Sequence, residues 1–138
     1  MGFIQPCFIR KNSPELINEL IDLGYVKALS DEEYTESEVY GLIVDQGDIV
    51  PLEHPLQEDE LIFTYNFIDC DDNEELFIAL ASMTDNEHGL CDYYIVTTDS
   101  NYTYTKGSIH RALPLSSVIH PSFYRKATVE ELIEHFKK

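Results

Sequence analysis

Three segments with apolar residues at helical spacing are separated by short runs of β-branched and aromatic residues, and this order constrains the fold most. The helical segments are predicted at residues 14–23, 73–84 and 128–137. The chain lacks the strict alternation of strand and helix that is typical of a parallel sheet. We therefore expect an α+β fold with a mainly antiparallel sheet, formed as a single domain by residues 1–138.

The first and third helices carry clear terminal signals. Ser13 can cap the first helix, Pro14 suits its first turn, and Gly24 can end it. Thr128 and Glu131 form a T-x-x-E capping box at the start of the third helix. The positions of the third helix expected to face the core are Val129, Leu132, Ile133 and Phe136.

Runs of β-forming residues fill most of the remaining chain. They occupy residues 3–9, 25–29, 39–44, 61–68, 93–98, 102–105 and 117–119, and we expect five or six of them to form strands. The runs at 93–98 and 102–105 flank Asp99-Ser100-Asn101, which predicts a hairpin with a three-residue loop. Long loops are expected at 30–38, 51–60 and 85–92, and any functional site is expected on them.

The cysteines indicate a reducing compartment, because Cys7, Cys70 and Cys91 are widely spaced and form no C-x-x-C pair. The apolar run at the N-terminus is too short for the core of a signal peptide and has no basic residue before it. No stretch approaches the roughly 20 apolar residues that a membrane span needs. We expect a cytoplasmic protein without a membrane role.

The formal charge of −17 is spread unevenly along the chain. No Lys or Arg occurs from Ala28 to Thr105, and this acidic window holds 20 of the 26 Asp and Glu residues. Such a charge disfavours direct binding of nucleic acid. Two interpretations stay open, since the acidic window either attracts a basic partner protein or only keeps a small protein soluble and monomeric.

Residues 69–73 match the opening of a calcium loop, with side-chain oxygens at the first, third and fifth positions. The rest of the pattern fails, because Glu74 stands where the loop needs Gly and Leu80 where it needs a bidentate Glu. We interpret the segment as the entry into the second helix, with Asp72 or Asn73 as its cap.

No other motif assigns a metal, a cofactor or a catalytic residue. His88 and Cys91 have the spacing of two zinc ligands, but a structural zinc site needs four and no second pair is present. Ser108, His110 and His120 are the candidates for nucleophilic catalysis, and no nucleophile elbow surrounds them. Phosphate-binding glycine motifs are also missing.

Four tyrosines near the predicted hairpin allow two interpretations. They are Tyr93, Tyr94, Tyr102 and Tyr104. They form either an aromatic platform for a ligand or cross-strand pairs that stabilise the sheet, and the second interpretation is favoured.

Three segments resemble a group of small uncharacterised proteins of gut anaerobes, their phages and mobile elements. The segments are CFIRKNSPEL at 7–16, NEELFIALA at 73–81 and KATVEELIEHF at 126–136, about a fifth of the chain. The resemblance implies a shared scaffold with no known activity, and an accessory protein that acts by binding a host factor.

The leading hypothesis from the sequence is therefore a small acidic, non-enzymatic interaction protein that binds a basic protein. The alternative is a small enzyme whose site is assembled from distant carboxylates and histidines. The candidate histidines are His54, His88, His110 and His120.

Overall fold

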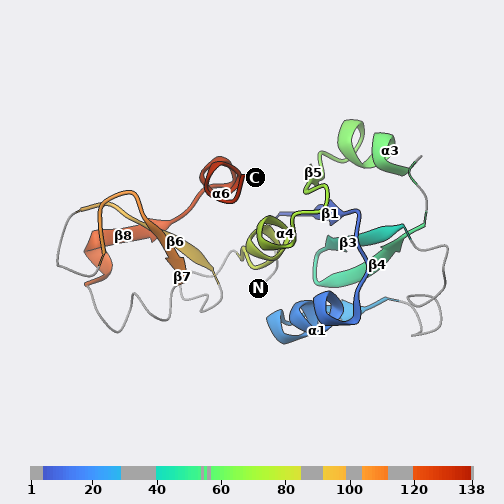
Figure 1. The fold of residues 1–138 in the computed structure, drawn as a ribbon, viewed down its shortest axis with the longest axis horizontal. Helices are drawn as coiled ribbons and strands as arrows, with labels where there is room; N and C mark the ends of the chain where they lie inside the picture. The colour runs from blue at the N-terminus through green and yellow to red at the C-terminus, as the bar shows by residue number, and fades with distance from the viewer. Residues whose placement is uncertain are drawn as a thin grey trace.

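The described residues form two β-sheets with helices packed on and between them (Figure 1). The computed structural model describes residues 5–28, 40–53, 55, 57–84, 92–98, 104–111 and 120–137, without the side chains of residues 57 and 121. Within these ranges, most strand pairs are antiparallel, so the α+β class is confirmed. None of the described helices is long and apolar enough to cross a bilayer.

The elements follow one another in the order β1 (Cys7–Ile9), α1 (Pro14–Leu23), β2 (Val26–Lys27), β3 (Gly41–Asp45), β4 (Asp48–Leu52), α3 (Gln57–Phe63), β5 (Ile68–Asp69), α4 (Glu74–Ala81), β6 (Tyr93–Val96), β7 (Ile109–Arg111), the 3-10 helix η1 (Pro121–Phe123), β8 (Tyr124–Lys126) and α6 (Val129–His135).

The larger sheet has the strand order β2-β4-β3-β1-β5. Its β3–β4 hairpin closes through Gln46-Gly47, whose φ angles of 51° and 92° are those of a tight turn matched to the twist of the strands. β1 lies between β3, an antiparallel neighbour, and β5, a parallel one. Only glycine fits at the start of β3, because a Cβ on Gly41 would lie 1.9 Å from the carbonyl oxygen of Ile9.

Both faces of the larger sheet are covered. Cys7 and Ile9 of β1 point to the face covered by α1 and α4, and Phe8 points to the opposite face. That second face is covered by α3, whose Leu61 and Ile62 pack against the cluster around Phe8. The larger sheet therefore has a large hydrophobic cluster on the face of α1 and α4 and a smaller one on the face of α3, and the described part of the smaller sheet has a further cluster around Tyr94 and Val96.

The smaller sheet has the order β7-β6-β8 and is connected to the larger one through α6. Figure 1 shows α6 between this sheet and α4. Tyr93 of β6 packs edge-on against Phe136, with ring centroids 5.4 Å apart. On the other side, the Asn73 side chain donates from Nδ2 to the carbonyl oxygen of Phe136 over 2.7 Å.

The three predicted helices are confirmed, and so are their N-caps. The Ser13 hydroxyl accepts a hydrogen bond from the Leu16 N–H, and Gly24 adopts a left-handed φ of 111°. Thr128 and Glu131 form both hydrogen bonds of the capping box.

The helix ends differ from the prediction by a few residues. The second helix ends at Ala81 instead of residue 84, where the hydroxyl of the following Ser82 donates to the carbonyl oxygen of Ala79. The third helix spans Val129–His135, and its Ile133 is 36% exposed, so the expectation that Ile133 faces the core is wrong.

The predicted strand at 61–68 is wrong. Residues Gln57–Phe63 form α3, and of the run only Ile68 lies in a strand, the first residue of β5. A short apolar run does not distinguish a strand from a helix, and the predicted loop at 51–60 contains the acidic first turn of α3. That loop is also wrong at its start, because β4 continues to Leu52.

The predicted hairpin between 93–98 and 102–105 is also wrong. β6 pairs with β7 and β8 instead, and both partners are short, polar strands without apolar alternation. The predicted strands at 3–9, 25–29 and 39–44 are confirmed over shorter or shifted spans, as β1, β2 and β3. Residues 30–38, 85–91, 99–103 and 117–119 lie outside the described residues.

The docking of α6 can be tested with neighbouring residues. Leu132 is 1% exposed, whereas Ile133 is 36% exposed. We predict that Leu132→Ala lowers the free energy of unfolding by about 2–5 kcal/mol, Thr128→Ala by about 1 kcal/mol and Ile133→Ala by about 0.5 kcal/mol. Denaturant unfolding curves, fitted with one common dependence of the free energy on denaturant concentration, measure the three changes in stability. Equal losses at positions 132 and 133 would contradict the packing of α6.

Candidate functional site

Arg10, directly after β1, holds three carboxylates around one guanidinium. Its Nε donates to Glu58 of α3 over 2.8 Å, and its Nη2 donates to Asp69 of β5 over 2.8 Å. Nη1 lies 3.2 Å from the carboxylate of Asp71, and the guanidinium lies over the ring of Phe8. The cluster fastens α3 and β5 to the end of β1.

This arrangement sets the protonation of the carboxylates. Hydrogen bonds from Arg10 lower the pKa of Glu58 below its usual range. Partial burial raises the pKa of Asp69, but the hydrogen bonds from Arg10 and from the backbone of Asp71 outweigh it, so that the pKa of Asp69 is also lowered. The folded state therefore favours the ionised carboxylates. Their contribution to stability is present above their unfolded pKa values of about 4 and is lost as the pH falls through the lower folded values.

We predict that Arg10→Gln lowers the free energy of unfolding at pH 7 by about 2 kcal/mol, between the values typical of exposed and of buried ion pairs. Without the guanidinium, the carboxylates repel one another and their folded pKa values are no longer lowered. Protonating them between about pH 5 and pH 3 should then cost the variant less stability than it costs the wild type. Lys11→Gln is the control with the same change of charge, since Lys11 pairs with Glu74 on the surface at 3.3 Å. Unfolding curves across this pH range are the measurement, and identical pH profiles for the two variants would contradict the assignment.

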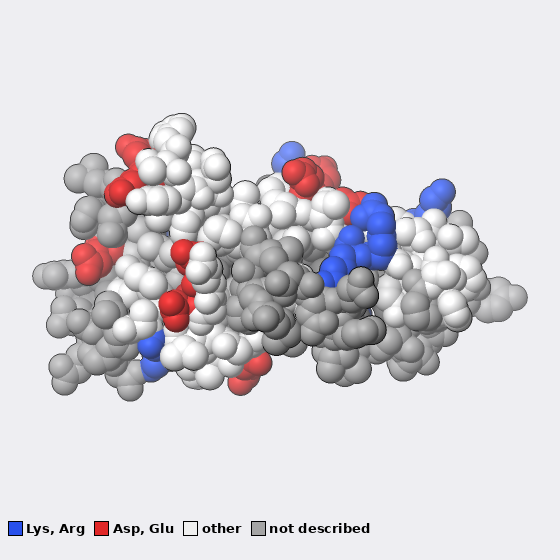
Figure 2. All heavy atoms as spheres, turned by 180° about the vertical axis from the view of Figure 1, so that it is seen from behind, with Lys and Arg blue, Asp and Glu red and all other residues white. Residues whose placement is uncertain are grey.

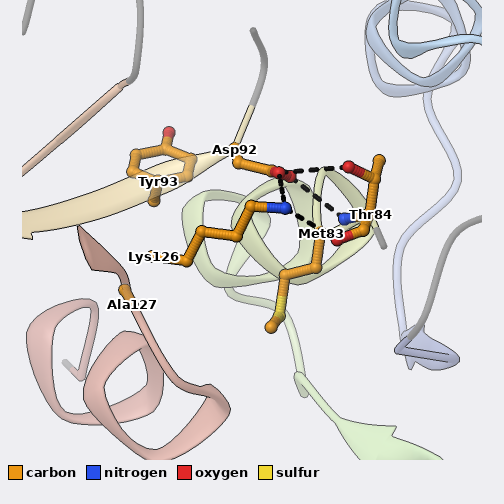
Figure 3. Close-up of a pocket in the computed structure, with 6 residues that line it drawn as sticks. All are labelled: Met83, Thr84, Asp92, Tyr93, Lys126 and Ala127. Atoms are coloured by element: carbon orange, nitrogen blue, oxygen red, sulfur yellow. Dashed lines mark hydrogen bonds and ion pairs between the residues drawn. The ribbon is translucent and has the colours of Figure 1, made fainter. Parts of the chain in front are cut away.

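A second polar cluster joins α4 to the smaller sheet (Figure 3). Asp92, immediately before β6, is 2% exposed. Its carboxylate accepts hydrogen bonds from the backbone N–H of Thr84 (3.0 Å) and from the Thr84 hydroxyl (3.1 Å). The ammonium of Lys126 lies 2.9 Å from the same carboxylate and donates to the carbonyl oxygen of Thr84 over 3.1 Å.

These residues line a cavity of about 20 Å³ together with Met83, Tyr93 and Ala127. This volume holds about one water molecule. The charged groups of the cavity are bonded to one another, as Figure 3 shows. The cluster thus connects the end of α4 to β6 and β8 by hydrogen bonds and an ion pair.

We predict that Lys126→Met destabilises the chain by about 3 kcal/mol, because it leaves the buried Asp92 carboxylate without its counter-ion. The double variant Asp92→Asn/Lys126→Met should be more stable than Lys126→Met alone, because the neutral amide requires no counter-ion. A double-mutant cycle of unfolding free energies measures this coupling. Strictly additive losses would show that the two residues are not coupled.

A larger hollow lies between α1, α4 and β7. It measures about 310 Å³ and is lined by Glu19, Asp22, Leu23, Ile78 and Arg111. The guanidinium of Arg111 also lies over the Tyr93 ring, 5.2 Å from its centroid. The volume is at the lower end of the range for small-molecule pockets. Its charged residues are all exposed, and neither His110 nor His120 lines it.

The candidate nucleophiles have local partners. His110 Nε2 lies 2.9 Å from the Ser108 hydroxyl, but that hydroxyl donates to the carbonyl oxygen of Thr105 over 2.6 Å. General-base activation requires the hydroxyl proton to point at the imidazole. Here the proton of Ser108 points at the carbonyl oxygen of Thr105 instead. His120 Nδ1 lies 2.9 Å from the hydroxyl of Ser122, the middle residue of η1. His54 and His88 lie outside the described residues.

The other motifs found in the sequence are used for folding. Asn73 caps α4 by accepting from the Leu76 N–H over 3.1 Å, so the interpretation of residues 69–73 as a helix entry is confirmed. In the described ranges, no three His, Cys, Asp or Glu side chains converge as metal ligands. Burial raises the pKa of the Cys7 thiol well above its usual value, which disfavours a reactive thiolate.

The tyrosines pack with aromatic neighbours. Tyr94 contacts Tyr124 of β8 with ring centroids 5.3 Å apart, and Tyr104 contacts the ring of His110 at 4.5 Å. Tyr94 and Tyr124 lie on paired strands, but Tyr124 is not one of the four tyrosines, and the hairpin that was expected to pair the four is wrong. Tyr102 and Cys91 lie outside the described residues.

Comparison with known proteins adds no further assignment. No protein-family model, curated protein or solved structure matches the chain.

Proposed function

We propose that the chain is a non-enzymatic interaction protein of the cytoplasm that binds a basic protein through the acidic surface around its five-stranded sheet. The observation that carries the proposal is the separation of charge between the two parts of the fold. Described residues from 5 to 84, here called the acidic half, include fourteen Asp and Glu against three Lys and Arg, a formal charge of −11. Described residues from 92 to 137 include four acids and five bases, a formal charge of +1.

The acids of the acidic half are available at the surface. Eleven of the fourteen are exposed. Arg10 is already shared among three carboxylates, and Lys11 is paired with Glu74. Figure 2, the view from behind, shows red acidic atoms over the part that contains α3 and the larger blue areas in the opposite half. This excess of negative charge attracts a basic surface and repels nucleic acid and anionic lipid.

The cytoplasmic setting is supported by Cys7 and Cys70, which are buried free thiols. The resemblance of the three helix segments supports an accessory protein encoded by a phage or mobile element, for which a basic host protein is a suitable partner. Two of the candidate histidines, His110 and His120, are described by the structure, and each contacts a nearby serine hydroxyl. The Ser108 hydroxyl donates its proton to the carbonyl oxygen of Thr105, so His110 does not activate it.

Salt-dependent capture tests the proposal. We predict that the immobilised chain retains basic proteins from a cell lysate at about 0.1 M salt and releases them at about 1 M, where the screening length falls from about 10 to 3 Å. A bait with four exposed acids of the acidic half neutralised should retain less. The substitutions are Glu19→Gln, Asp48→Asn, Asp59→Asn and Glu60→Gln.

The solubility interpretation gives a different outcome. If the acids only keep the protein in solution, neither bait retains basic proteins and the neutralised variant precipitates at a lower concentration. Capture that is equal for both baits would also contradict the proposal.

A further inference from the structure

The outer face of α3 carries an aromatic side chain that does not contribute to the core. Leu61 and Ile62 are partly buried against the Phe8 cluster, whereas the next residue, Phe63, is 81% exposed. Helical spacing explains the separation, because residue 63 lies on the side of the helix away from the sheet. An exposed phenylalanine gains little from folding, so its presence at this position needs another reason.

Phe63 is not isolated on this surface. Tyr65, two residues further on, is 56% exposed, and its ring packs edge-on against Phe67 with centroids 6.4 Å apart. The other exposed large apolar side chains of the described residues are Ile21, Val26, Phe123 and Ile133, and no two of them lie within four positions of each other in the chain. Phe63 and Tyr65 are thus two exposed aromatic side chains two positions apart, where α3 ends, and aromatic side chains are enriched at interaction sites.

Acidic residues stand one helical turn before the aromatic pair. Asp59 and Glu60 precede Phe63 by four and three residues, which places them beside it on the outer face of α3, and both are exposed. Glu58 points elsewhere and is held by Arg10. In Figure 2, red atoms stand next to uncharged white atoms in the region of α3. The outer face thus presents the carboxylates of Asp59 and Glu60 beside the ring of Phe63, and Tyr65 follows in the turn after α3.

We propose that Asp59, Glu60, Phe63 and Tyr65 form the docking surface of α3 for an amphipathic basic segment of the partner, with Lys or Arg residues one helical turn from apolar side chains. The inference rests on the proposed function and names the part of the acidic half that makes the contact. The cations of the segment pair with Asp59 and Glu60, and its apolar side chains cover Phe63 and Tyr65. The aromatic contact adds affinity that salt does not screen.

Charge favours a basic segment on this surface over a second copy of the chain or an anionic membrane. A second copy of the chain would bring two acidic halves together, each with a formal charge of −11 in the described residues. An anionic membrane would be repelled by the same charge. A basic segment is attracted, and its apolar side chains match the aromatic pair.

Two synthetic peptides test the inference. The first has about 20 residues with Lys or Arg one helical turn from Leu or Phe, and the second replaces every Leu and Phe by Ser. We predict that the chain binds the first peptide about tenfold more tightly, the effect of covering roughly one aromatic side chain. Phe63→Ser should remove most of the difference between the peptides, whereas Val26→Ser, which removes an exposed apolar side chain elsewhere, should retain it. Fluorescence anisotropy of labelled peptides measures the affinities.

A charge-matched pair of variants tests the acidic part of the surface. Asp59→Lys/Glu60→Lys should weaken both peptides about tenfold more than Glu15→Lys/Glu19→Lys, because both pairs of substitutions change the net charge equally and only the first lies beside Phe63. Circular dichroism checks that each variant is folded. Equal weakening would mean that only the total charge matters, which overturns the placement on α3.

The outcomes separate the two proposals. Equal affinity of the two peptides for the wild type overturns the aromatic docking surface and leaves the proposed function supported. No binding of either peptide at low salt overturns both. A dimer of the chain alone that is lost in Phe63→Ser, measured by sedimentation velocity, assigns the surface to a second copy and overturns the inference. Binding to phosphatidylcholine vesicles that depends on Phe63 also overturns it.

Discussion

The burial of β1 on both faces is the constraint on which the rest of the structure depends. Cys7, Phe8 and Ile9 are completely inaccessible to solvent. Because successive residues of a strand point to opposite sides, three residues are sufficient to anchor helices on both faces of the sheet. Like β4, the strand has an antiparallel neighbour on one edge and a parallel one on the other. Unlike β4, it is followed directly by Arg10, so hydrophobic packing and ion pairs meet at one place.

The sequence predicts what local interactions determine. Helix caps such as Thr128 with Glu131 act within three positions of the chain, so the helices they begin were predicted correctly. Strands such as β7 and β8 are short and polar, and only their distant partner β6 makes them strands. The same limit explains the missed clusters, because Glu58 lies 48 residues from Arg10, and no local pattern connects such groups.

The sequence does not reveal the proposed docking surface, for a related reason. In a strand at 61–68, Phe63 would alternate with Ile62 and would share a face with Leu61. In a helix, Phe63 turns away from both, and its exposure becomes visible only with that assignment. The acidic first turn of α3 was the available signal, because Asp and Glu are favoured at helix N-termini. The acidic window itself is not one surface, since Asp92 is buried and paired with Lys126.

The hydrogen bond from Asn73 to the carbonyl oxygen of Phe136 spans 63 positions of the chain, whereas the β3–β4 hairpin closes through two residues. The entropy lost in closing a loop grows with its length, so the hairpin can form at much lower cost than the contact between α4 and α6. The apolar side of α4 that faces α6 is buried only after α6, which lies far along the chain, has packed against it. The order of assembly is thus set by topology, with the local hairpin favoured early and the joining of the two sheets through α6 favoured late.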